Sequence, residues 1–403
     1  MNAGRGRTER GITPDSIFEV VKMNMNSPEA PNDHTLQEDL QIIAESPLVR
    51  DNKDKFAGRT FLITGATGLV GSILVKALAC VNRTKNYGMR ILPLIRSVEK
   101  AKTVYGELWG REDLFPVLSD ITAPDLNEKV QEISGGRPDY VIHCAAVTTS
   151  KVMISRPVET IRSAIEGTMK LLDAAMAGTS DDAGKPVFLY ISSMEAYGDM
   201  SVYGPDTRAS EERGGFVDPM KVRSNYPLSK RMCENLCVAC HEEYGLHTRV
   251  ARLAQTFGAG TLPWESRVFA QFAKSTLRGE DIVLHTKGLS EGNYCYTRDM
   301  VLGLLTILVA GEDASAYNVC NMAAHTTIAG MAELVADKIA EDVCGRKIRV
   351  TYDIPENNIY GYAADTKLTL DSHKLMALGW QPAVSLEEAF RRTIASMKER
   401  GIS

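Results

Sequence analysis

The chain has 403 residues of ordinary composition, with 44% hydrophobic and 24% charged residues and a formal net charge of −5. This mild acidity favours neither nucleic acid nor an anionic membrane as a partner. No apolar run reaches the roughly 18 residues that a membrane-spanning helix needs, and no secretory signal follows the N-terminal arginines, so we expect a cytoplasmic protein.

The N-terminal part of the chain is expected to form a tail and a short helix ahead of the nucleotide-binding domain. Residues 1–34 are polar and rich in Gly, Asn, Pro and charged residues, a composition typical of a disordered tail. Residues 35–57 begin with a short amphipathic helix over Thr35–Glu45, whose apolar residues recur on one face, and continue as a linker.

A glycine-rich turn between a strand and a helix is the most informative stretch. Phe61–Ile63 predicts a buried strand, and the glycines that follow have the spacing G-x-x-G-x-x-G. Gly65 would allow a tight turn, Gly68 a close approach of backbone N–H groups to a pyrophosphate, and Gly71 close packing of the helix. The predicted dinucleotide contacts are Gly65, Thr67, Gly68, Leu69, Val70 and Gly71.

The ends of the next two strands bear on the choice of cofactor. The strand expected over Met89–Ile95 ends at Arg96 and Ser97, where an acidic residue would bind the ribose hydroxyls of NAD. Arg96 would instead attract a 2′-phosphate, which favours NADP over NAD, although a solvated arginine is also common at a strand end. Asp120 and Ile121 follow the third strand and are expected at the adenine edge, although Asp120 could equally cap a helix.

Two separate segments are expected to form the reaction centre. Ser193 follows a strand predicted over Val187–Ile191, at the end where parallel sheets bind ligands. Tyr226 and Lys230 are four residues apart on a predicted helix, so they share one face. An ammonium group near a phenol favours the phenolate, which would let Tyr226 act as a base near neutral pH.

Strands alternate with helices through the first two thirds of the chain, which predicts an α/β fold of the Rossmann type with a doubly wound parallel sheet. We assign residues 58–257 to a dinucleotide-binding domain and residues 258–403 to a smaller substrate-binding lobe with interleaved late sheet elements. Residues 201–218, rich in Gly, Pro and charge, are expected to form a loop and could act as a lid. The remaining predicted strands are Phe115–Leu118, Tyr140–Cys144, Arg249–Leu253, Asp281–His285 and Tyr317–Val319, and the remaining helices are Thr160–Met176, Tyr226–Tyr244, Arg267–Leu277, Asp299–Val309, Thr327–Ile339 and Leu386–Met397.

A cysteine cluster invites a metal or haem hypothesis. Cys237 to His241 spells C-x-x-C-H, the haem-attachment pattern. However, Cys233, Cys237 and Cys240 lie at i, i+4 and i+7 on one face of a predicted apolar helix. Free cysteine behaves as a small buried hydrophobic residue, so we favour core packing and expect no metal.

With these motifs in this order, the chain resembles the extended short-chain dehydrogenases/reductases, in the NAD-dependent epimerase/dehydratase family that modifies nucleotide sugars, over roughly residues 58–400. The resemblance implies that Ser193, Tyr226 and Lys230 oxidise a sugar at C4, with Tyr226 taking the hydroxyl proton. It further implies cofactor contacts at Ala145, Ala146, Tyr226 and Lys230, and substrate contacts at Thr148, Ser193, Met194, Gln255 and Arg267. The matching segments are TGATGLVG, Asp120-Ile121, His143 to Ala146, Ile191 to Ser193, YPLSK, Tyr317 to Val319 and Leu378 to Pro382.

The branch of the family is harder to assign. Glu195 stands where 4,6-dehydratases and UDP-glucuronate decarboxylases carry a glutamate, next to a 4-keto sugar whose C5 proton it could remove. Met194 replaces the aspartate of many dehydratases, Gly292 the arginine of decarboxylases, and Gln255 a usual asparagine. Dehydration, decarboxylation and epimerisation therefore stay open, with a keto-sugar reductase or a simple C4-epimerase as alternatives.

The resemblance also implies a homodimer in which two helices from each subunit form a four-helix bundle. The helices over Thr160–Met176 and Tyr226–Tyr244 are the candidates. Their apolar faces exceed what one sheet face needs; these faces comprise Ile161, Ile165, Leu172, Cys233, Leu236 and Cys240.

Overall fold

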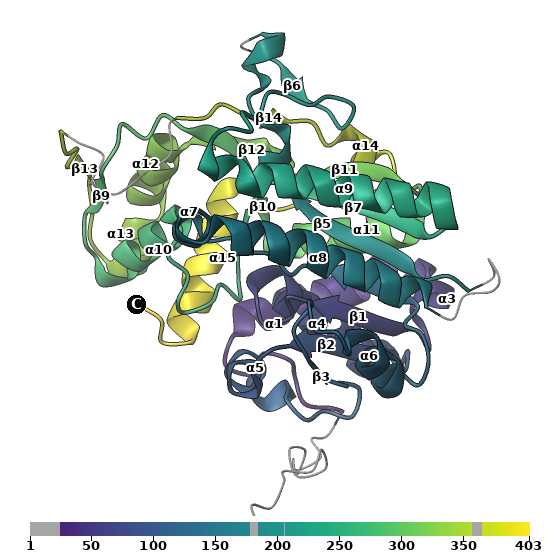
Figure 1. Cartoon of the computed structure of the whole chain (residues 1–403). Coiled ribbons are helices and arrows are strands. Elements are labelled where there is room, and N and C mark those ends of the chain that lie inside the picture. The colour runs from purple at the N-terminus through teal and green to yellow at the C-terminus, as the bar shows by residue number, and fades with distance from the viewer. Residues whose placement is uncertain (1–24, 178–183, 205, 357–364) are drawn as a thin grey trace, which may run out of the picture.

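A seven-stranded parallel sheet organises the chain, and helices lie on both of its faces (Figure 1). The computed structural model describes residues 25–177, 184–204, 206–356 and 365–403. The strand order is β11-β7-β5-β4-β1-β2-β3, and all neighbouring pairs are parallel, which confirms the predicted fold class. The strands are β1 (Thr60–Thr64), β2 (Arg90–Ile95), β3 (Val117–Leu118), β4 (Tyr140–His143), β5 (Val187–Ser193), β7 (His247–Leu253) and β11 (Ser315–Val319).

The strand order reverses direction beside β1. From β1 the chain adds β2 and β3 on one side, then returns to add β4, β5, β7 and β11 on the other. Doubly wound sheets bind ligands outside the carboxyl ends of the strands at such a switch point. Here that point lies between Gly65, which follows β1, and Ala145, which follows β4.

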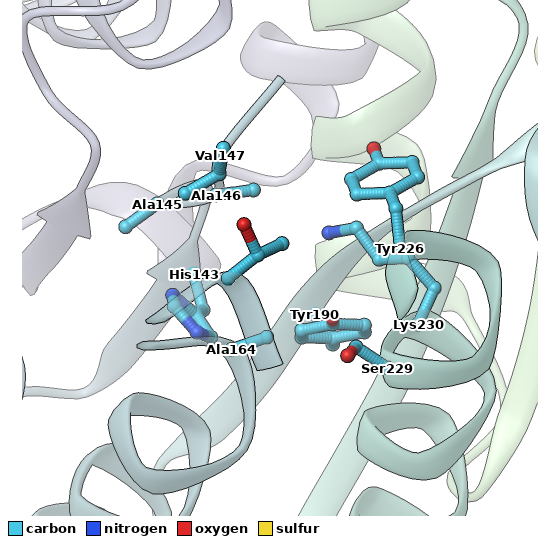
Figure 2. Close-up of a pocket in the computed structure, with 10 residues that line it drawn as sticks. His143, Ala145, Ala146, Val147, Ala164, Tyr190, Tyr226, Ser229 and Lys230 are labelled. Carbon is cyan, nitrogen blue, oxygen red and sulfur yellow. The ribbon is translucent and has the colours of Figure 1, made fainter. Parts of the chain in front are cut away.

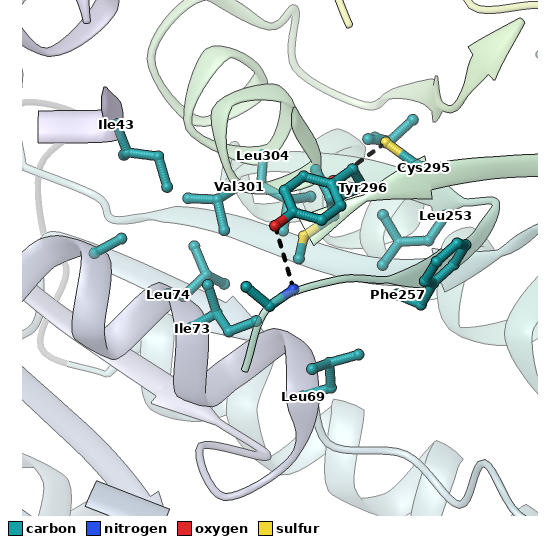
Figure 3. Packing of buried hydrophobic residues seen from close by; sticks show 14 of the residues in the cluster. Ile43, Leu69, Ile73, Leu74, Leu253, Phe257, Cys295, Tyr296, Val301 and Leu304 are labelled. Atoms are coloured by element: carbon teal, nitrogen blue, oxygen red, sulfur yellow. Dashed lines mark hydrogen bonds between the residues drawn. The ribbon is translucent and has the colours of Figure 1, made fainter. Parts of the chain in front are cut away.

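Residues of β1 alternate between two hydrophobic cores, one on each face of the sheet. Phe61 and Ile63 belong to the larger core and Leu62 to the smaller one, as the alternation of side chains along a strand requires. In the larger core, Figure 3 shows Ile43, Ile73 and Val301 side by side; they come from α1, α4 and α11. The helices of this core include α1 (His34–Glu45), α4 (Leu69–Lys85) and α11 (Thr297–Ala310), and those of the smaller core α6 (Leu126–Ser134), α8 (Pro157–Met176) and α9 (Asn225–Tyr244).

The cysteine face of α9 packs in the smaller core, as predicted. Cys233 and Cys237 are buried there and Cys240 lies at its margin. Two residues that we had counted toward a dimer surface are in fact part of this core, since Leu172 and Cys233 are fully buried within the single chain. More of the apolar surface of these two helices packs against the sheet than we predicted from the sequence pattern.

The predicted boundary of the N-terminal tail at residue 34 is wrong, because residues 29–33 pack against the fold. The Glu29 carboxylate is buried and accepts hydrogen bonds from Arg83 and Arg111. Asp33 caps α1 by accepting a hydrogen bond from the Leu36 backbone N–H at 2.9 Å. The buried Arg111 and the partly buried Arg83 need a carboxylate partner, and Glu29 supplies it. Residues 1–24 of the predicted tail lie outside the described residues.

The second half of the chain adds small sheets and helices around the carboxyl ends of the main strands. Asp299 holds the segment before the last helix in place, because its carboxylate accepts backbone hydrogen bonds from Ala383 and Val384. The small sheets are β12-β10-β8 (Asn321–Thr327, Glu291–Tyr296, Gln255–Phe257), β13-β9 (Val350–Tyr352, Ile282–Leu284) and β14-β6 (Thr369–Leu370, Arg208–Ala209). The helices are α10 (Val268–Arg278), α12 (Ile328–Lys338), α13 (Ala340–Cys344), α14 (His373–Met376) and α15 (Leu386–Glu399).

The segment over residues 201–218, predicted as a loop that could act as a lid, is anchored near its middle. Its two-residue strand β6 pairs with β14, more than 150 residues later in the chain. The Asn318 side chain donates a hydrogen bond to the Ala209 carbonyl at 2.9 Å. A two-residue strand leaves no readable period in a sequence, so only its distant partner defines it.

The remaining helices are short. They are α2 (Pro47–Asp51), α3 (Lys53–Phe56), α5 (Val98–Tyr105) and α7 (Ser150–Ser155), with single 3₁₀ turns η2 (Gly106–Leu108), η3 (Met194–Tyr197), η4 (Met200–Tyr203) and η5 (Val222–Ser224). Among the described residues, no helix is both long and apolar enough to cross a membrane.

Candidate active site

The glycine-rich turn after β1 forms a cradle that larger residues would fill. Gly65 has φ of +61°, and a Cβ there would lie 2.7 Å from the Ala145 nitrogen. A Cβ at Gly71 would lie 2.5 Å from the Gly65 carbonyl oxygen, so the first turn of α4 packs directly on the loop. Gly68 is the N-cap of α4 and supplies no capping side chain, which leaves the first N–H groups of the helix free for an anion. The turn therefore fits the pyrophosphate of a dinucleotide.

Buried hydrogen bonds fix this turn against β4. The Thr64 hydroxyl lies 2.7 Å from Nδ1 of His143 and accepts a hydrogen bond from the Ala145 N–H at 3.1 Å. Burial, with a smaller contribution from Lys230, lowers the pKa of His143 to about 3, so the imidazole stays neutral. Tyr105, which the sequence analysis missed, donates a hydrogen bond from its hydroxyl to the Ala66 carbonyl at 2.6 Å. These contacts hold the cradle in shape without occupying its N–H groups.

The structure brings together the two strand-end residues considered for the adenosine end of the cofactor. Nη1 of Arg96 lies 3.6 Å from Oδ2 of Asp120, and the Arg96 side chain is 79% exposed. Asp120 also accepts hydrogen bonds from the backbone and hydroxyl of Thr122, so it caps a turn. Ser97 is the N-cap of α5, and Ile121 is buried against α8 at Gly167.

Tyr226 and Lys230 project from α9 into a narrow cavity beside the cofactor cradle (Figure 2). Lys230 Nζ donates a hydrogen bond to the Ile191 carbonyl at 2.7 Å and lies 5.7 Å from the centre of the Tyr226 ring. The Tyr226 side chain also hydrogen-bonds with Ser193 at the end of β5. The ten lining residues are His143, Ala145, Ala146, Val147, Thr160, Ala164, Tyr190, Tyr226, Ser229 and Lys230.

The electrostatics of Tyr226 differ from the prediction. Burial, helped by the charge of Glu195, raises the pKa of Tyr226 to about 12, although Arg223 and Arg267 act in the opposite direction. Burial also lowers the pKa of Lys230 to about 8. Lys230 does not by itself make Tyr226 a base near neutral pH, because its ammonium group is directed to the Ile191 carbonyl.

Glu195 is the second residue of the turn η3, which begins directly after Ser193. Its carboxylate is paired with an arginine. Both of its carboxylate oxygens accept from Nη2 of Arg223, at 3.1 and 2.8 Å. The Arg223 guanidinium lies 5.8 Å from the centre of the Tyr226 ring. The sequence analysis gave Arg223 no role, because it lies in an irregular segment before α9 whose spacing carries no signal.

Met194 and Gly292, two positions that depart from relatives, meet in space. A Cβ at Gly292 would lie 3.2 Å from Cε of Met194. Gly292 is buried in β10, and Met194 is partly buried in the turn after β5. The thioether of Met194 therefore covers the place from which a side chain at 292 would start. Together these two residues present an apolar, uncharged wall.

The other predicted substrate contacts lie at the surface around this region. Thr148 is exposed between β4 and α7, and Gln255 is exposed on β8. Arg267 is exposed at the start of α10, where Nη2 lies 2.7 Å from the Glu265 carboxylate. Its positive charge acts to lower the pKa of Tyr226. The structure brings neither Thr148 nor Gln255 into the narrow cavity.

Comparison with known proteins agrees with this fold. The model of a family described as the NAD dependent epimerase/dehydratase family matches residues 61–321. UDP-glucuronic acid decarboxylase 6 of Arabidopsis thaliana is 29% identical over 343 residues, which cover 85% of this chain and 90% of that protein. A dTDP-glucose 4,6-dehydratase of Haemophilus influenzae is 25% identical over 83% of this chain and 96% of its own. The structure of an epimerase, Mth375 of Methanothermobacter thermautotrophicus, aligns over 88% of this chain and 96% of its own with a TM-score of 0.71 and 21% identity.

Proposed function

Because the chain belongs to the NAD dependent epimerase/dehydratase family, we propose that it modifies a nucleotide-activated sugar by transient oxidation at C4, followed by chemistry at C5 or C6. The observation that carries this proposal is the convergence of Ser193, Tyr226 and Lys230 beside the glycine cradle. The names of the relatives, which include decarboxylases and a dehydratase of nucleotide sugars, support the substrate class.

The residues divide the oxidation step between them. Tyr226 takes the proton of the sugar hydroxyl, and the Ser193 hydroxyl, which hydrogen-bonds to the phenol, holds that sugar oxygen in place. Arg223 and Arg267 favour the phenolate, whereas burial and Glu195 oppose it. A bound oxidised nicotinamide supplies a hydride acceptor and a positive charge at this place. Lys230, which donates a hydrogen bond to the Ile191 carbonyl, places a second positive charge beside that of the nicotinamide.

Glu195 supports further chemistry beyond C4. Its carboxylate is kept in position by Arg223, and its backbone N–H donates a hydrogen bond to the Ser193 hydroxyl, so we expect the carboxylate to reach a proton acidified by a neighbouring ketone. The uncharged wall of Met194 and Gly292 offers no cation to a uronate carboxylate. Both observations favour removal of the C5 proton, by a dehydratase or a C5 epimerase, over decarboxylation.

A second candidate is a net NADPH-dependent reductase of a keto-sugar. The observation that favours it is Arg96, whose guanidinium is largely exposed at the end of β2 and makes only a 3.6 Å ion pair with Asp120, so it can also meet a 2′-phosphate. We propose NADP as the preferred cofactor for this reason, in either reaction.

We further propose that the chain forms a homodimer through α8 and α9. These helices lie side by side on one face of the molecule (Figure 1). Large apolar side chains remain exposed on them, which favours burial against a second copy. These residues are Val158, Ile161, Met169, Met232 and Val238.

The proposed reaction is tested by incubating the full chain with a panel of nucleotide sugars. Products are identified by mass spectrometry while the absorbance of reduced nicotinamide is followed. A recycling enzyme changes the sugar with no net change in nicotinamide, whereas a reductase consumes NADPH. Binding of cofactor without any product would contradict both candidates.

A further inference from the structure

A second cavity lies on the far side of α4, apart from the reaction centre. It has a volume of about 170 Å³ and shares no lining residue with the cavity around Tyr226 and Lys230. Its walls come from α1, α4, α5, the loop over residues 260–264 and the end of the chain. The lining residues are Leu36, Ser72, Ile73, Lys76, Thr103, Val104, Gly260, Leu262, Pro263, Trp264, Arg400 and Ile402.

The cavity is open at one side and apolar over most of its wall. Thr103, Pro263 and Trp264 are exposed, so they form a mouth through which a molecule can enter. Leu36 and Ile73 line the inner side and belong to the hydrophobic core. An apolar cavity of about 150 Å³ in another protein is large enough to bind benzene, so this one can take a ligand with an aromatic or short aliphatic body.

The polar part of the wall carries an excess positive charge. The guanidinium of Arg400 already has polar partners, since its Nε lies 2.9 Å from the Asp33 carboxylate and its Nη2 donates a hydrogen bond to the Thr261 carbonyl at 2.7 Å. Glu29, the next carboxylate, is engaged by Arg83 and Arg111. Lys76 therefore has no carboxylate of its own among the lining residues, and Asp33 and Glu29 act on it only from a distance.

Lys76 itself is only partly exposed, on the face of α4 that lines the cavity. Within the described part of the chain its ammonium group makes no hydrogen bond or ion pair. Burial and the neighbouring Arg400 lower the pKa of Lys76 to about 8, against the smaller opposing effects of Asp33 and Glu29. An ammonium held in such a place gains most from a single anionic group.

From the apolar walls and this one cation without a hydrogen-bond or ion-pair partner, we infer that the cavity binds a small carboxylic acid, with its carboxylate on Lys76 and its apolar body against Leu36, Ile73 and Trp264. A single ammonium group without a direct partner matches a monoanion better than a phosphate dianion. The site rests on different residues from the proposed function and does not depend on it.

A ligand at this place would contact elements that frame the active site. Val104 is next to Tyr105, whose hydroxyl holds the Ala66 carbonyl in the cofactor turn. Trp264 precedes Glu265, the partner of Arg267. The cavity therefore shares elements with both the cofactor cradle and the loop that leads to Arg267.

The test measures binding of benzoate to the full chain by isothermal titration calorimetry, with benzyl alcohol as the neutral analogue and inorganic phosphate as a second anion. We expect benzoate to bind and the other two to bind at least about tenfold more weakly, because only benzoate combines a single charge with an apolar body. Lys76→Met should weaken benzoate binding by about tenfold or more, and Lys76→Arg should restore most of it. Lys102→Met, at an exposed lysine of α5 outside the cavity, is the matched control and should leave binding unchanged.

Thr103→Trp is a second test that leaves Lys76 unchanged. The larger side chain narrows the mouth of the cavity and should therefore also weaken benzoate binding. The inference is overturned if Lys76→Met changes the affinity by less than twofold, or if benzyl alcohol binds as tightly as benzoate. It is equally overturned if NADP or NAD displaces benzoate competitively, because the acid would then occupy the cofactor cradle. Should Lys76→Met not fold, Thr103→Trp decides between these outcomes by itself.

Discussion

Glu195 and Arg223 form an ion pair at the edge of the reaction centre, with Nη2 of the arginine 2.8 Å from Oε2 of the carboxylate. The pair joins two segments that lie 28 residues apart, the turn after β5 and the turn before α9. Both residues act on the pKa of Tyr226, Glu195 by raising it and Arg223 by lowering it. The charge state of the presumed base is therefore coupled to the carboxylate proposed for the C5 chemistry.

Tyr226→Phe should abolish turnover and leave cofactor binding nearly intact, because it deletes the proton acceptor and keeps the ring. Removal of a general base typically costs about 10²–10⁴ in rate. The check is kcat on the true substrate beside the dissociation constant for NADP. Tyr244→Phe, at an exposed tyrosine at the end of the same helix, is the control. Retention of more than a tenth of the activity would rule out Tyr226 as the base.

Glu195→Gln should separate the two stages of the reaction. If Glu195 removes the C5 proton, the variant still oxidises C4 and accumulates reduced cofactor with a 4-keto sugar. In a decarboxylase the loss of carbon dioxide needs no base at C5, so Glu195 would instead position the substrate. The variant would then slow the first oxidation itself. Rapid-mixing absorbance of reduced nicotinamide measures the difference. If the Glu195→Gln variant has wild-type kinetics, Glu195 takes no part in the reaction, which would favour the simple C4-epimerase.

Arg96→Asp should shift preference from NADP towards NAD, because the 2′-phosphate loses a charge-assisted hydrogen bond worth roughly 1.5–3 kcal/mol. Since Arg96 is 79% exposed, solvent screening keeps the effect near or below the lower end of that range. The measurement is the ratio of dissociation constants for the two cofactors, with Lys102→Asp as a control for general charge. A wild type that binds NAD more tightly than NADP would show that Arg96 does not meet a 2′-phosphate.

Gly71→Ala should weaken the cofactor cradle, because the new Cβ would lie 2.5 Å from the Gly65 carbonyl oxygen and only backbone could yield. Overpacking of this kind typically costs about 1–3 kcal/mol in the free energy of unfolding. Gly214→Ala is the matched control, since a Cβ there meets nothing within 4 Å. Urea unfolding and cofactor titration give the two readings, and an unchanged affinity in Gly71→Ala would contradict the placement of the pyrophosphate.

The proposed dimer predicts a mass of two chains by light scattering at micromolar concentration. Val158→Asp and Met232→Asp introduce charge on the exposed faces of α8 and α9 and should yield monomers. Val283→Asp, at an exposed valine of β9 in the other half of the chain, should leave the dimer intact. A wild-type monomer at that concentration would count against the helix interface.

Much of the fold could be predicted because its signals are local and repeated. The strands over Phe61–Ile63 and Arg249–Leu253 and the helix over Thr160–Met176 all lie within a few residues of their predicted bounds. Apolar runs and helical periods of this length reflect burial on one or both faces, which tertiary structure only completes. The short strands β6, β8 and β14 escaped prediction, because two or three residues show no period and depend on a distant partner.

The sequence by itself determined the sheet, the glycine turn, and the resemblance that places Ser193, Tyr226 and Lys230 in one centre, since each of these rests on residue type and near spacing. Only the tertiary structure decided what surrounds them. It paired Glu195 with Arg223, set Met194 over Gly292, directed Lys230 to the Ile191 carbonyl, and buried Glu29 beneath two arginines. Such contacts join segments tens to hundreds of residues apart, and their energies depend on burial and distance, which no local pattern encodes.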